Sequence, residues 1–260
     1  MQKSFLKITV IQSNIVWHNA VENRKIFSEK ISLINHETDV IILPEMFTTG
    51  FTMQPEEVAE EMHGETTKWM QQMAFKKNAA ICGSVVILEN NSYYNRFLFV
   101  HPSGEIDYYN KRHLFTLAGE HEVYVAGLQK KIVEYKGWKI CPIICYDLRF
   151  PVWARNIEDY DVLIVVANWP SPRILAWDTL LQARAIENMC YVIGVNRVGI
   201  DANNLEYNGH SAVFNSLGNQ ILKLIENQEF SETFVLRREH LEETRNKLNF
   251  LADKDNFVIK

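Results

Sequence analysis

Cys145 has the sequence setting of a nucleophile. An apolar run, residues 140–144, ends at this cysteine, and a polar segment, residues 146–151, follows it. The pattern predicts a thiol at the carboxyl end of a buried strand, just before a helix, where ligand crevices open in α/β sheets. The N-terminus of a helix favours a thiolate and can donate N–H groups to an oxyanion. For this residue alone, a small buried cysteine that only packs is an equally good interpretation.

Two further segments carry a carboxylate and an ammonium group in comparable settings. Glu45 follows the apolar run 40–43, and Pro44 ends that strand, so the carboxylate leaves the sheet at a fixed place. A carboxylate on apolar ground suits a general base. Lys111 stands among aromatic residues in segment 108–115, where a cation in a dry site would stabilise negative charge strongly. Taken singly, a solvated loop glutamate and a charged turn explain these segments as well.

Together and in this order, the three segments resemble the nitrilase, or carbon–nitrogen hydrolase, superfamily. The superfamily pattern is a Glu after a strand, a Lys in a middle segment and a Cys at a strand–helix elbow. Lys111 follows Glu45 by 66 residues, and Cys145 follows Lys111 by 34 residues, as the pattern requires. A second glutamate of the pattern matches Glu120. Further matching segments are residues 167–170, 182–188 and 209–214, so the resemblance runs from about residue 5 to about residue 245.

The resemblance implies an amidase that works through a thioester. Cys145 is expected to be the nucleophile, Glu45 the base that later passes its proton to the leaving ammonia, and Lys111 a cation near the oxyanion. The backbone N–H of Tyr146 is expected to be the second oxyanion donor. Glu120 is expected to bond to Lys111 and to the substrate amide nitrogen, and a structural role for it stays open. No metal and no organic cofactor are implied.

Within the superfamily, residues 43–51, 111–115 and 196–199 resemble the bacterial omega-amidase branch. Enzymes of that branch deaminate 2-oxoglutaramate and 2-oxosuccinamate to the corresponding 2-oxo dicarboxylates. Such a small-molecule substrate carries a carboxylate, which calls for a cation one substrate length from the thiol. Arg173 is the candidate for this cation, and a surface arginine is the alternative interpretation.

Aromatic residues near these motifs are expected to wall a small pocket that excludes water. For each of them, packing in the core is an open alternative. The aromatic candidates are Phe47, Phe51, Phe115 and Trp169. Arg149, two residues after Asp147, is expected to make a structural ion pair beneath the elbow. Arg184 and Asn188, which share a helix face, are expected to be structural or dimer-contact residues.

Three kinds of alternative compete with the omega-amidase. The first is a related enzyme with another substrate, because the same Glu, Lys and Cys would serve an N-carbamoyl-amine amidohydrolase, a nitrilase or an aliphatic amidase. A non-catalytic scaffold of the same fold is a rival from another class, which the intact set of three residues disfavours. A zinc hydrolase is disfavoured because the eight histidines form no HExxH motif.

Bulk properties indicate one globular domain over residues 1–260, with a C-terminal tail at about 249–260. Hydrophobic residues make up 47% of the chain and charged residues 23%, and the net charge of −5 disfavours a nucleic-acid partner. The four cysteines form no CxxC pair and three lie in apolar runs, which suits reduced thiols in the cytoplasm. No transmembrane run and no signal peptide are recognised, so no membrane partner is expected.

Segments with strand and helix patterns alternate along the chain, which predicts a layered α/β domain. Predicted strands are residues 6–12, 39–43, 79–88, 93–100, 105–109, 131–135, 138–145, 161–167, 191–196, 211–214 and 220–224, and predicted helices are 20–35, 66–77, 151–157, 174–188 and 236–247. The number of layers does not follow from the pattern. The resemblance implies a four-layer α-β-β-α sandwich of two packed mixed sheets, assembled at least as a homodimer.

Overall fold

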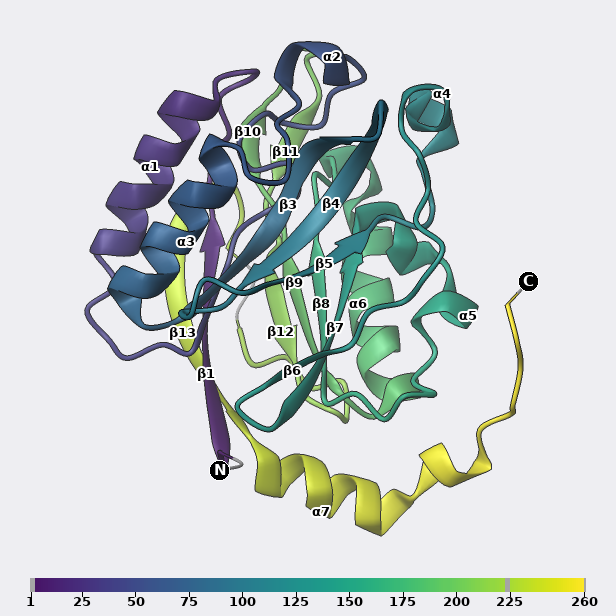
Figure 1. Ribbon diagram of the computed structural model, residues 1–260. Coiled ribbons are helices and arrows are strands. Elements are labelled where there is room, and N and C mark those ends of the chain that lie inside the picture. Colours follow the sequence, from purple (N-terminus) through teal and green to yellow (C-terminus); the bar gives the residue numbers. More distant parts are fainter. Residues whose placement is uncertain (1–2, 223–224, 260) are drawn as a thin grey trace.

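Two mixed sheets pack face to face, and helices cover both outer faces, in the computed structural model of residues 3–222 and 225–259 (Figure 1). This confirms the predicted α-β-β-α sandwich. The strands at the centre of each sheet are buried on both sides, which explains their unbroken apolar runs. None of the helices in the described part of the chain is long and apolar enough to span a membrane.

The first sheet has six strands, three of which run parallel at its centre. In sheet order they are β13 (Phe230–Arg237), β1 (Phe5–Gln12), β2 (Val40–Ile42), β3 (Ala80–Glu89), β4 (Ser92–Val100) and β5 (Ile106–Asn110). Helices α1 (Ala20–Ser32) and α3 (Glu65–Lys77) cover its outer face, with the short α2 (Pro55–Val58) beyond their ends. Phe27 of α1 and Met70 of α3 are buried against this sheet and hold the helices in place.

The second sheet has five strands, and its three central strands are also parallel. In sheet order they are β12 (Ala212–Phe214), β9 (Tyr191–Val195), β8 (Val162–Val166), β7 (Trp138–Ile144) and β6 (Val133–Tyr135). Helices α5 (Pro151–Ala154) and α6 (Ile174–Asn188) lie on its outer face. The remaining elements are α4 (Glu120–Val123), α7 (Arg238–Leu248), the two-stranded β10 (Val198–Ile200) and β11 (Glu206–Asn208), and the 3₁₀ turns η1 (Thr116–Ala118), η2 (Cys145–Arg149), η3 (Ser171–Arg173) and η4 (Phe250–Asp253).

The functional candidates lie just beyond the ends of strands. Glu45 follows β2, Lys111 follows β5 and Cys145 follows β7. Because parallel strands end at the same edge of a sheet, and the two sheets are stacked, residues far apart in the sequence meet at one edge. The amides Asn168 and Asn196 follow β8 and β9 in the same way and extend this polar edge.

Three differences from the sequence prediction concern the last sixty residues and one hairpin. Residues 230–237 form β13, which pairs with β1 along its whole length, and the final helix begins only at Arg238. The hairpin of β10 and β11 was not predicted. The predicted strand 220–224 is reduced to a single bridge between Gln220 and Phe214, and residues 223–224 lie outside the described residues.

Candidate active site

The chain turns sharply at Cys145, the first residue of η2. Its φ is +47°, in the left-handed region, which is energetically unfavourable for residues other than glycine. Met46, directly after Glu45, has a comparable φ of +42°. Backbone strain of this kind persists only where the surrounding structure holds it in place. Here it fixes the direction in which the side chain at each strand end leaves the sheet. The predicted elbow is therefore present, and its thiol is half-buried at the wall of a pocket.

The buried carboxylate of Asp147 holds the elbow together. It accepts hydrogen bonds from the Tyr109 hydroxyl at 2.8 Å and from the Ile144 N–H at 3.0 Å. The His113 N–H donates to it at 2.8 Å, and His113 Nδ1 lies at the same distance. Burial, and then the negative charge of Asp147, raise the pKa of the Tyr109 hydroxyl, so the phenol remains a donor. One side chain thus ties the end of β7, the end of β5 and the turn η2 to each other.

Replacing Asp147 by Ala should therefore destabilise the fold and distort the nucleophile elbow. Removing the carboxylate leaves buried donors without acceptors, and each costs about 1–3 kcal/mol. We expect a loss of about 3 kcal/mol or more in urea unfolding, together with a lower kcat. Asp159→Asn is the control, because Asp159 is exposed and asparagine tolerates its left-handed φ of +55°, so loss of its surface ion pair with Lys254 should cost under about 0.5 kcal/mol. Equal stability of the two variants would contradict this role.

Lys111 lies between two buried carboxylates. Its Nζ is 3.0 Å from Oε1 of Glu45, and 3.0 and 2.9 Å from the two oxygens of Glu120. All three charged groups are fully buried. Burial disfavours the ammonium, but the charges of Glu120 and Glu45 outweigh it and raise the pKa of Lys111. Lys111 is thus held as a cation, and the expected contact between Glu120 and Lys111 is present.

Glu120 is also held from the backbone. The N–H of Phe115 donates to its Oε2 at 2.6 Å. Burial raises the pKa of Glu120, and Lys111 opposes that rise. The turn η1 lies between Phe115 and Glu120 in the chain, and it folds the backbone so that these two residues can bond to each other.

Two asparagines orient Glu45. Asn95 of β4 donates from Nδ2 to Oε1 at 2.8 Å, and the backbone N–H of Asn168 donates to Oε2 at 2.7 Å. The side chain of Asn168 also donates to the backbone carbonyl of Glu45 at 2.7 Å. Asn95 was not predicted as a site residue, although an amide within the predicted strand 93–100 is a usable signal.

The thiol of Cys145 lies against this cluster. Burial raises the pKa of this thiol well above its ordinary value, the charge of Glu45 acts in the same direction, and Lys111 opposes both. The direction contradicts the expectation that the helix start would favour a thiolate. The resting nucleophile is therefore a thiol, with its sulfur 4.0 Å from the Asn168 carbonyl oxygen, and Glu45 has to remove its proton as attack occurs.

Tyr146, expected to be an oxyanion donor, is the second residue of η2. The first N–H groups of a helix have no acceptor within that helix, which leaves this N–H available beside the thiol. Its ring packs edge-on against Phe115 at 4.9 Å and against Phe150 at 5.1 Å. The side chain therefore anchors the peptide group that faces the site.

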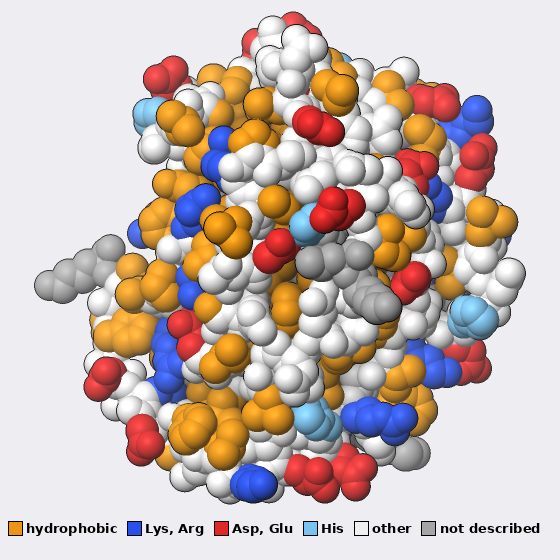
Figure 2. Space-filling view, turned by 180° about the vertical axis from the view of Figure 1, so that it is seen from behind, with side chains coloured by type: hydrophobic (Ala, Val, Ile, Leu, Met, Phe, Trp, Pro, Cys, Tyr) orange, Lys and Arg blue, Asp and Glu red, His pale blue; other side chains and the backbone are white. Residues whose placement is uncertain are grey.

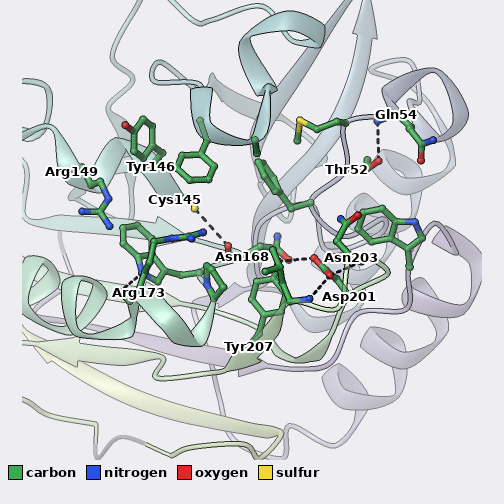
Figure 3. A pocket seen from close by; sticks show the side chains of 18 residues that line it. Thr52, Gln54, Cys145, Tyr146, Arg149, Asn168, Arg173, Asp201, Asn203 and Tyr207 are labelled. Atoms are coloured by element: carbon green, nitrogen blue, oxygen red, sulfur yellow. Dashed lines mark hydrogen bonds between the residues drawn. The ribbon is translucent and has the colours of Figure 1, made fainter.

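A pocket of about 450 Å³ opens over Cys145 (Figure 3). Apolar rings supply much of its wall, and polar side chains enter from several segments. It is lined by Trp17, Phe51, Thr52, Met53, Gln54, Phe115, Ala118, Cys145, Tyr146, Arg149, Asn168, Trp169, Pro170, Arg173, Asp201, Asn203, Leu205 and Tyr207. Phe51, Phe115, Trp169 and Arg173 are thus in the positions expected of pocket residues. The cluster of Glu45, Lys111 and Glu120 lies behind the thiol rather than in the wall.

Phe47 is misplaced in the sequence prediction. Its ring is fully buried between Phe27 and Trp69, in the core beneath α1 and α3, and does not line the pocket. The positive φ of Met46 turns the chain after Glu45, so the next side chain points into the sandwich layer below. The aromatic contact with the pocket is made by Phe51 instead.

Arg149 also differs from its prediction. Asp147 is occupied by Tyr109, Ile144 and His113, and Arg149 makes no ion pair within the described residues. Its guanidinium lies over the ring of Trp169, 4.9 Å from the centroid, and lines the pocket.

Arg184 and Asn188 make hydrogen bonds within the chain and do not line the pocket. Arg184 donates to the Leu148 carbonyl at 2.6 Å beneath the elbow, and Asn188 accepts from the Asn156 N–H at 2.9 Å.

The far wall of the pocket comes from the unpredicted β10–β11 hairpin. Asp201 closes the turn by accepting from the N–H groups of Asn203 at 2.8 Å and Leu205 at 3.0 Å. The hydroxyl of Tyr207 donates to the same carboxylate at 2.9 Å. The apolar segment 198–200, followed by two asparagines at 203–204 and an alternating segment 205–208, was the available signal. No group of three or more His, Cys, Asp or Glu side chains suited to a metal ion occurs within residues 3–222 and 225–259.

Comparison with known proteins agrees with this geometry. The sequence profile of the family described as Carbon-nitrogen hydrolase matches residues 7–245. The chain belongs to the carbon–nitrogen hydrolase family. Among relatives of this hydrolase, an Escherichia coli protein named omega-amidase YafV is 46% identical over 254 residues, with 98% of each chain covered. A Bacillus subtilis protein named 2-oxoglutaramate amidase is 36% identical over 216 residues, covering 81% of this chain and 83% of its own length.

A solved structure supports the same assignment. The carbon–nitrogen hydrolase XC1258 of Xanthomonas campestris, described with an arsenic adduct in its active site, has 42% sequence identity to this hydrolase and a TM-score of 0.97. The similarity covers 99% of this chain and 100% of the Xanthomonas chain.

Proposed function

We propose that this carbon–nitrogen hydrolase is an omega-amidase. It hydrolyses the terminal amide of 2-oxoglutaramate or 2-oxosuccinamate and releases ammonia and the 2-oxo dicarboxylate. Relatives named omega-amidase and 2-oxoglutaramate amidase support the activity. The observation that carries the proposal is a half-buried thiol on the wall of a pocket that also presents arginines, with the buried Glu45, Lys111 and Glu120 cluster behind it. Cysteine, base and anion-binding groups are what a carboxylated amide requires.

In the first half of the reaction, Glu45 removes the Cys145 proton while sulfur attacks the amide carbon. Lys111 and the Tyr146 N–H stabilise the negative charge that develops on oxygen. The carbon–nitrogen bond then breaks, and the proton held by Glu45 passes to the nitrogen, which leaves as ammonia. Glu120 holds Lys111 in place through two contacts and is the candidate acceptor for the substrate amide N–H.

In the second half, water replaces ammonia. Glu45 takes a proton from water as the oxygen attacks the thioester carbonyl, and the same oxyanion donors act again. The carbon–sulfur bond breaks and sulfur receives the proton from Glu45.

A substrate panel tests the assignment. Ammonia release is measured for 2-oxoglutaramate, 2-oxosuccinamate, glutamine, N-carbamoylputrescine, propionamide and simple nitriles. We expect the two 2-oxo acid amides to have the highest kcat/KM. Equal rates on propionamide would contradict the omega-amidase, and a higher rate on the carbamoyl amine or a nitrile would favour those alternative members of the superfamily. A chain with no turnover and four equally slow thiols would indicate a scaffold.

We also propose that the protein assembles as a homodimer or a larger homo-oligomer. Apolar side chains are exposed on the outer sides of α5 and α6, among them Val152, Ile186 and Leu175, which is 78% exposed. The segment after α7 extends away from the sandwich (Figure 1), and Val258 in this segment is 88% exposed. Multi-angle light scattering should give a mass of at least two chains. A monomer at micromolar concentration would contradict the assembly.

The proposed location is the cytoplasm. Four free cysteines, three of them buried, suit a reducing compartment. The face of the molecule in Figure 2 mixes acidic, basic and apolar side chains. Cell fractionation of the native producer, with the protein detected by antibody, tests the location. Recovery in a membrane or extracellular fraction would contradict it.

A further inference from the structure

The pocket has an asymmetric distribution of charge. Arg149 and Arg173 both line it, half-buried, and neither makes an ion pair within residues 3–222 and 225–259. Each guanidinium lies over an aromatic ring: Arg149 over Trp169 at 4.9 Å and Arg173 over Phe115 at 5.3 Å. Stacking fixes the plane of each group and leaves its N–H edges free to bind a ligand.

The negative charge of the pocket lies on the opposite side. Figure 3 shows Arg149 and Arg173 on one side of Cys145, with Asp201 and Asn203 on the other. Both oxygens of Asp201 are already occupied, one by two backbone N–H groups and the other by the Tyr207 hydroxyl. Burial and the nearby Asp201 raise the pKa of Tyr207, so this phenol remains the donor in that contact. Asp201 is therefore engaged in holding its hairpin.

Each side of the pocket offers a different kind of partner to a substrate whose amide carbon is at Cys145. A guanidinium has only donors and a permanent positive charge. A 2-oxo carboxylate presents only acceptors and a negative charge, so it matches two arginines at once. A 2-amino carboxylate places an ammonium group, which has only donors, at the position of the 2-oxo oxygen. Donors would then face donors, and like charges would meet in a partly desolvated site.

We propose that Arg149 and Arg173 together form a donor-only clamp that selects amides of 2-oxo acids and rejects the corresponding amides of 2-amino acids. The inference rests on the proposed function and specifies which residues set its substrate class. Arg149 lies four residues after Cys145 on η2, and Arg173 ends η3, which follows Trp169 and Pro170. Both arginines thus lie on segments that also carry the thiol of Cys145 or the pocket residues Trp169 and Pro170. The clamp would prevent the enzyme from consuming glutamine and asparagine.

The test compares 2-oxoglutaramate, glutaramate and glutamine, which differ only at C2. The wild type should have the highest kcat/KM for 2-oxoglutaramate, then glutaramate, then glutamine. In Arg149→Gln and in Arg173→Gln, we expect the ratio of kcat/KM for 2-oxoglutaramate to that for glutamine to fall at least about tenfold. Each variant loses one charged contact with the substrate, and a tenfold effect is usual for the loss of such a contact. Arg149→Lys should keep part of the ratio, because the charge remains and the planar fork is lost.

A ratio measured on one protein preparation does not depend on the fraction that is folded, so a partly unfolded variant still gives a valid answer. Arg237→Gln is the matched control, because Arg237 is exposed at the end of β13, outside the pocket, and should leave the ratio unchanged. If the wild type prefers 2-oxoglutaramate, and Arg149→Gln and Arg173→Gln both keep the wild-type ratio of kcat/KM, the clamp is wrong and the proposed function stands. If the wild type hydrolyses propionamide as fast as 2-oxoglutaramate, the proposed function itself fails.

Discussion

Replacing Cys145 by Ala should lower kcat by at least about 10⁴-fold, since a reaction that depends on a covalent intermediate loses nearly all of its catalysis with its nucleophile. The remaining residues can still bind substrate, so KM or a measured Kd should change far less than kcat. Ammonia release from 2-oxoglutaramate measures the effect. Mass spectrometry of wild-type enzyme quenched during turnover should find the acyl group on the peptide that contains residue 145.

The matched control is Cys190→Ala, which removes another thiol that is buried far from the pocket wall. It should keep activity within about threefold of the wild type, because it leaves every site residue in place. Retention of more than about one per cent of activity by Cys145→Ala would contradict the nucleophile assignment.

The raised pKa of the thiol adds a second expectation for this residue. Burial and the charge of Glu45 keep the resting thiol protonated, and Lys111 opposes them. Glu45→Gln removes that charge, so it should lower the thiol pKa and leave alkylation by iodoacetamide as fast or faster, while turnover falls because the base is gone. Slower alkylation in Glu45→Gln than in the wild type would contradict this account of the thiol.

How much of this site can be predicted from sequence depends on what holds each residue. Glu45 and Cys145 each follow an apolar run at a strand end, and Lys111 stands in an aromatic segment, but each of them alone had an equally good alternative interpretation. Their order and spacing, which resemble a known family, identified them as a set. The edge at which they meet follows from the parallel strands β2, β7 and β8, whose order in the sheets was not readable from periodicity. Only the resemblance to a family supplied the stacking of the two sheets.

The errors have a common cause, which is that a residue's direction is set by backbone turns that the sequence pattern does not display. Phe47 was expected in the pocket, but the left-handed Met46 turns it into the core. Arg149 was expected under the elbow, but Asp147 had already been filled by donors from β5 and the following loop. Strand β13 was missed because only Leu236 of its eight residues is buried, and because its pairing partner β1 lies more than 200 residues away in the sequence.

Lys111→Met should separate the two roles of the central cation. Without the ammonium, Glu45 and Glu120 face each other in a buried site with no positive partner. Removing one partner of a buried ion pair typically costs about 3–5 kcal/mol of stability. Loss of an oxyanion donor typically lowers kcat by about 10²–10³-fold. Lys68→Met is the control, because Lys68 is exposed and pairs only with Glu65 on the surface of α3, so it should cost under about 0.5 kcal/mol.

The stability loss of Lys111→Met should depend on pH in a defined direction. With the cation gone, burial raises the pKa of the Glu120 carboxyl further, because Lys111 no longer opposes that rise. Such a group costs no stability when it is protonated in both states, and the cost grows as pH increases toward the raised folded pKa. Urea unfolding should therefore place the variant close to the wild type near about pH 4 and furthest below it near about pH 8.

A double variant decides whether lost stability explains lost activity. Lys111→Met/Glu120→Gln removes one of the two uncompensated carboxylates, so it should recover much of the free energy of unfolding at pH 8 that Lys111→Met loses. It should not recover kcat, because neither Met nor Gln places a positive charge beside the developing oxyanion. Recovery of kcat along with stability would show that Lys111 acts only by holding the fold. Stability recovered without activity, when Glu120→Gln alone keeps most of the wild-type kcat, would assign to the Lys111 ammonium a direct part in the cleavage of the amide.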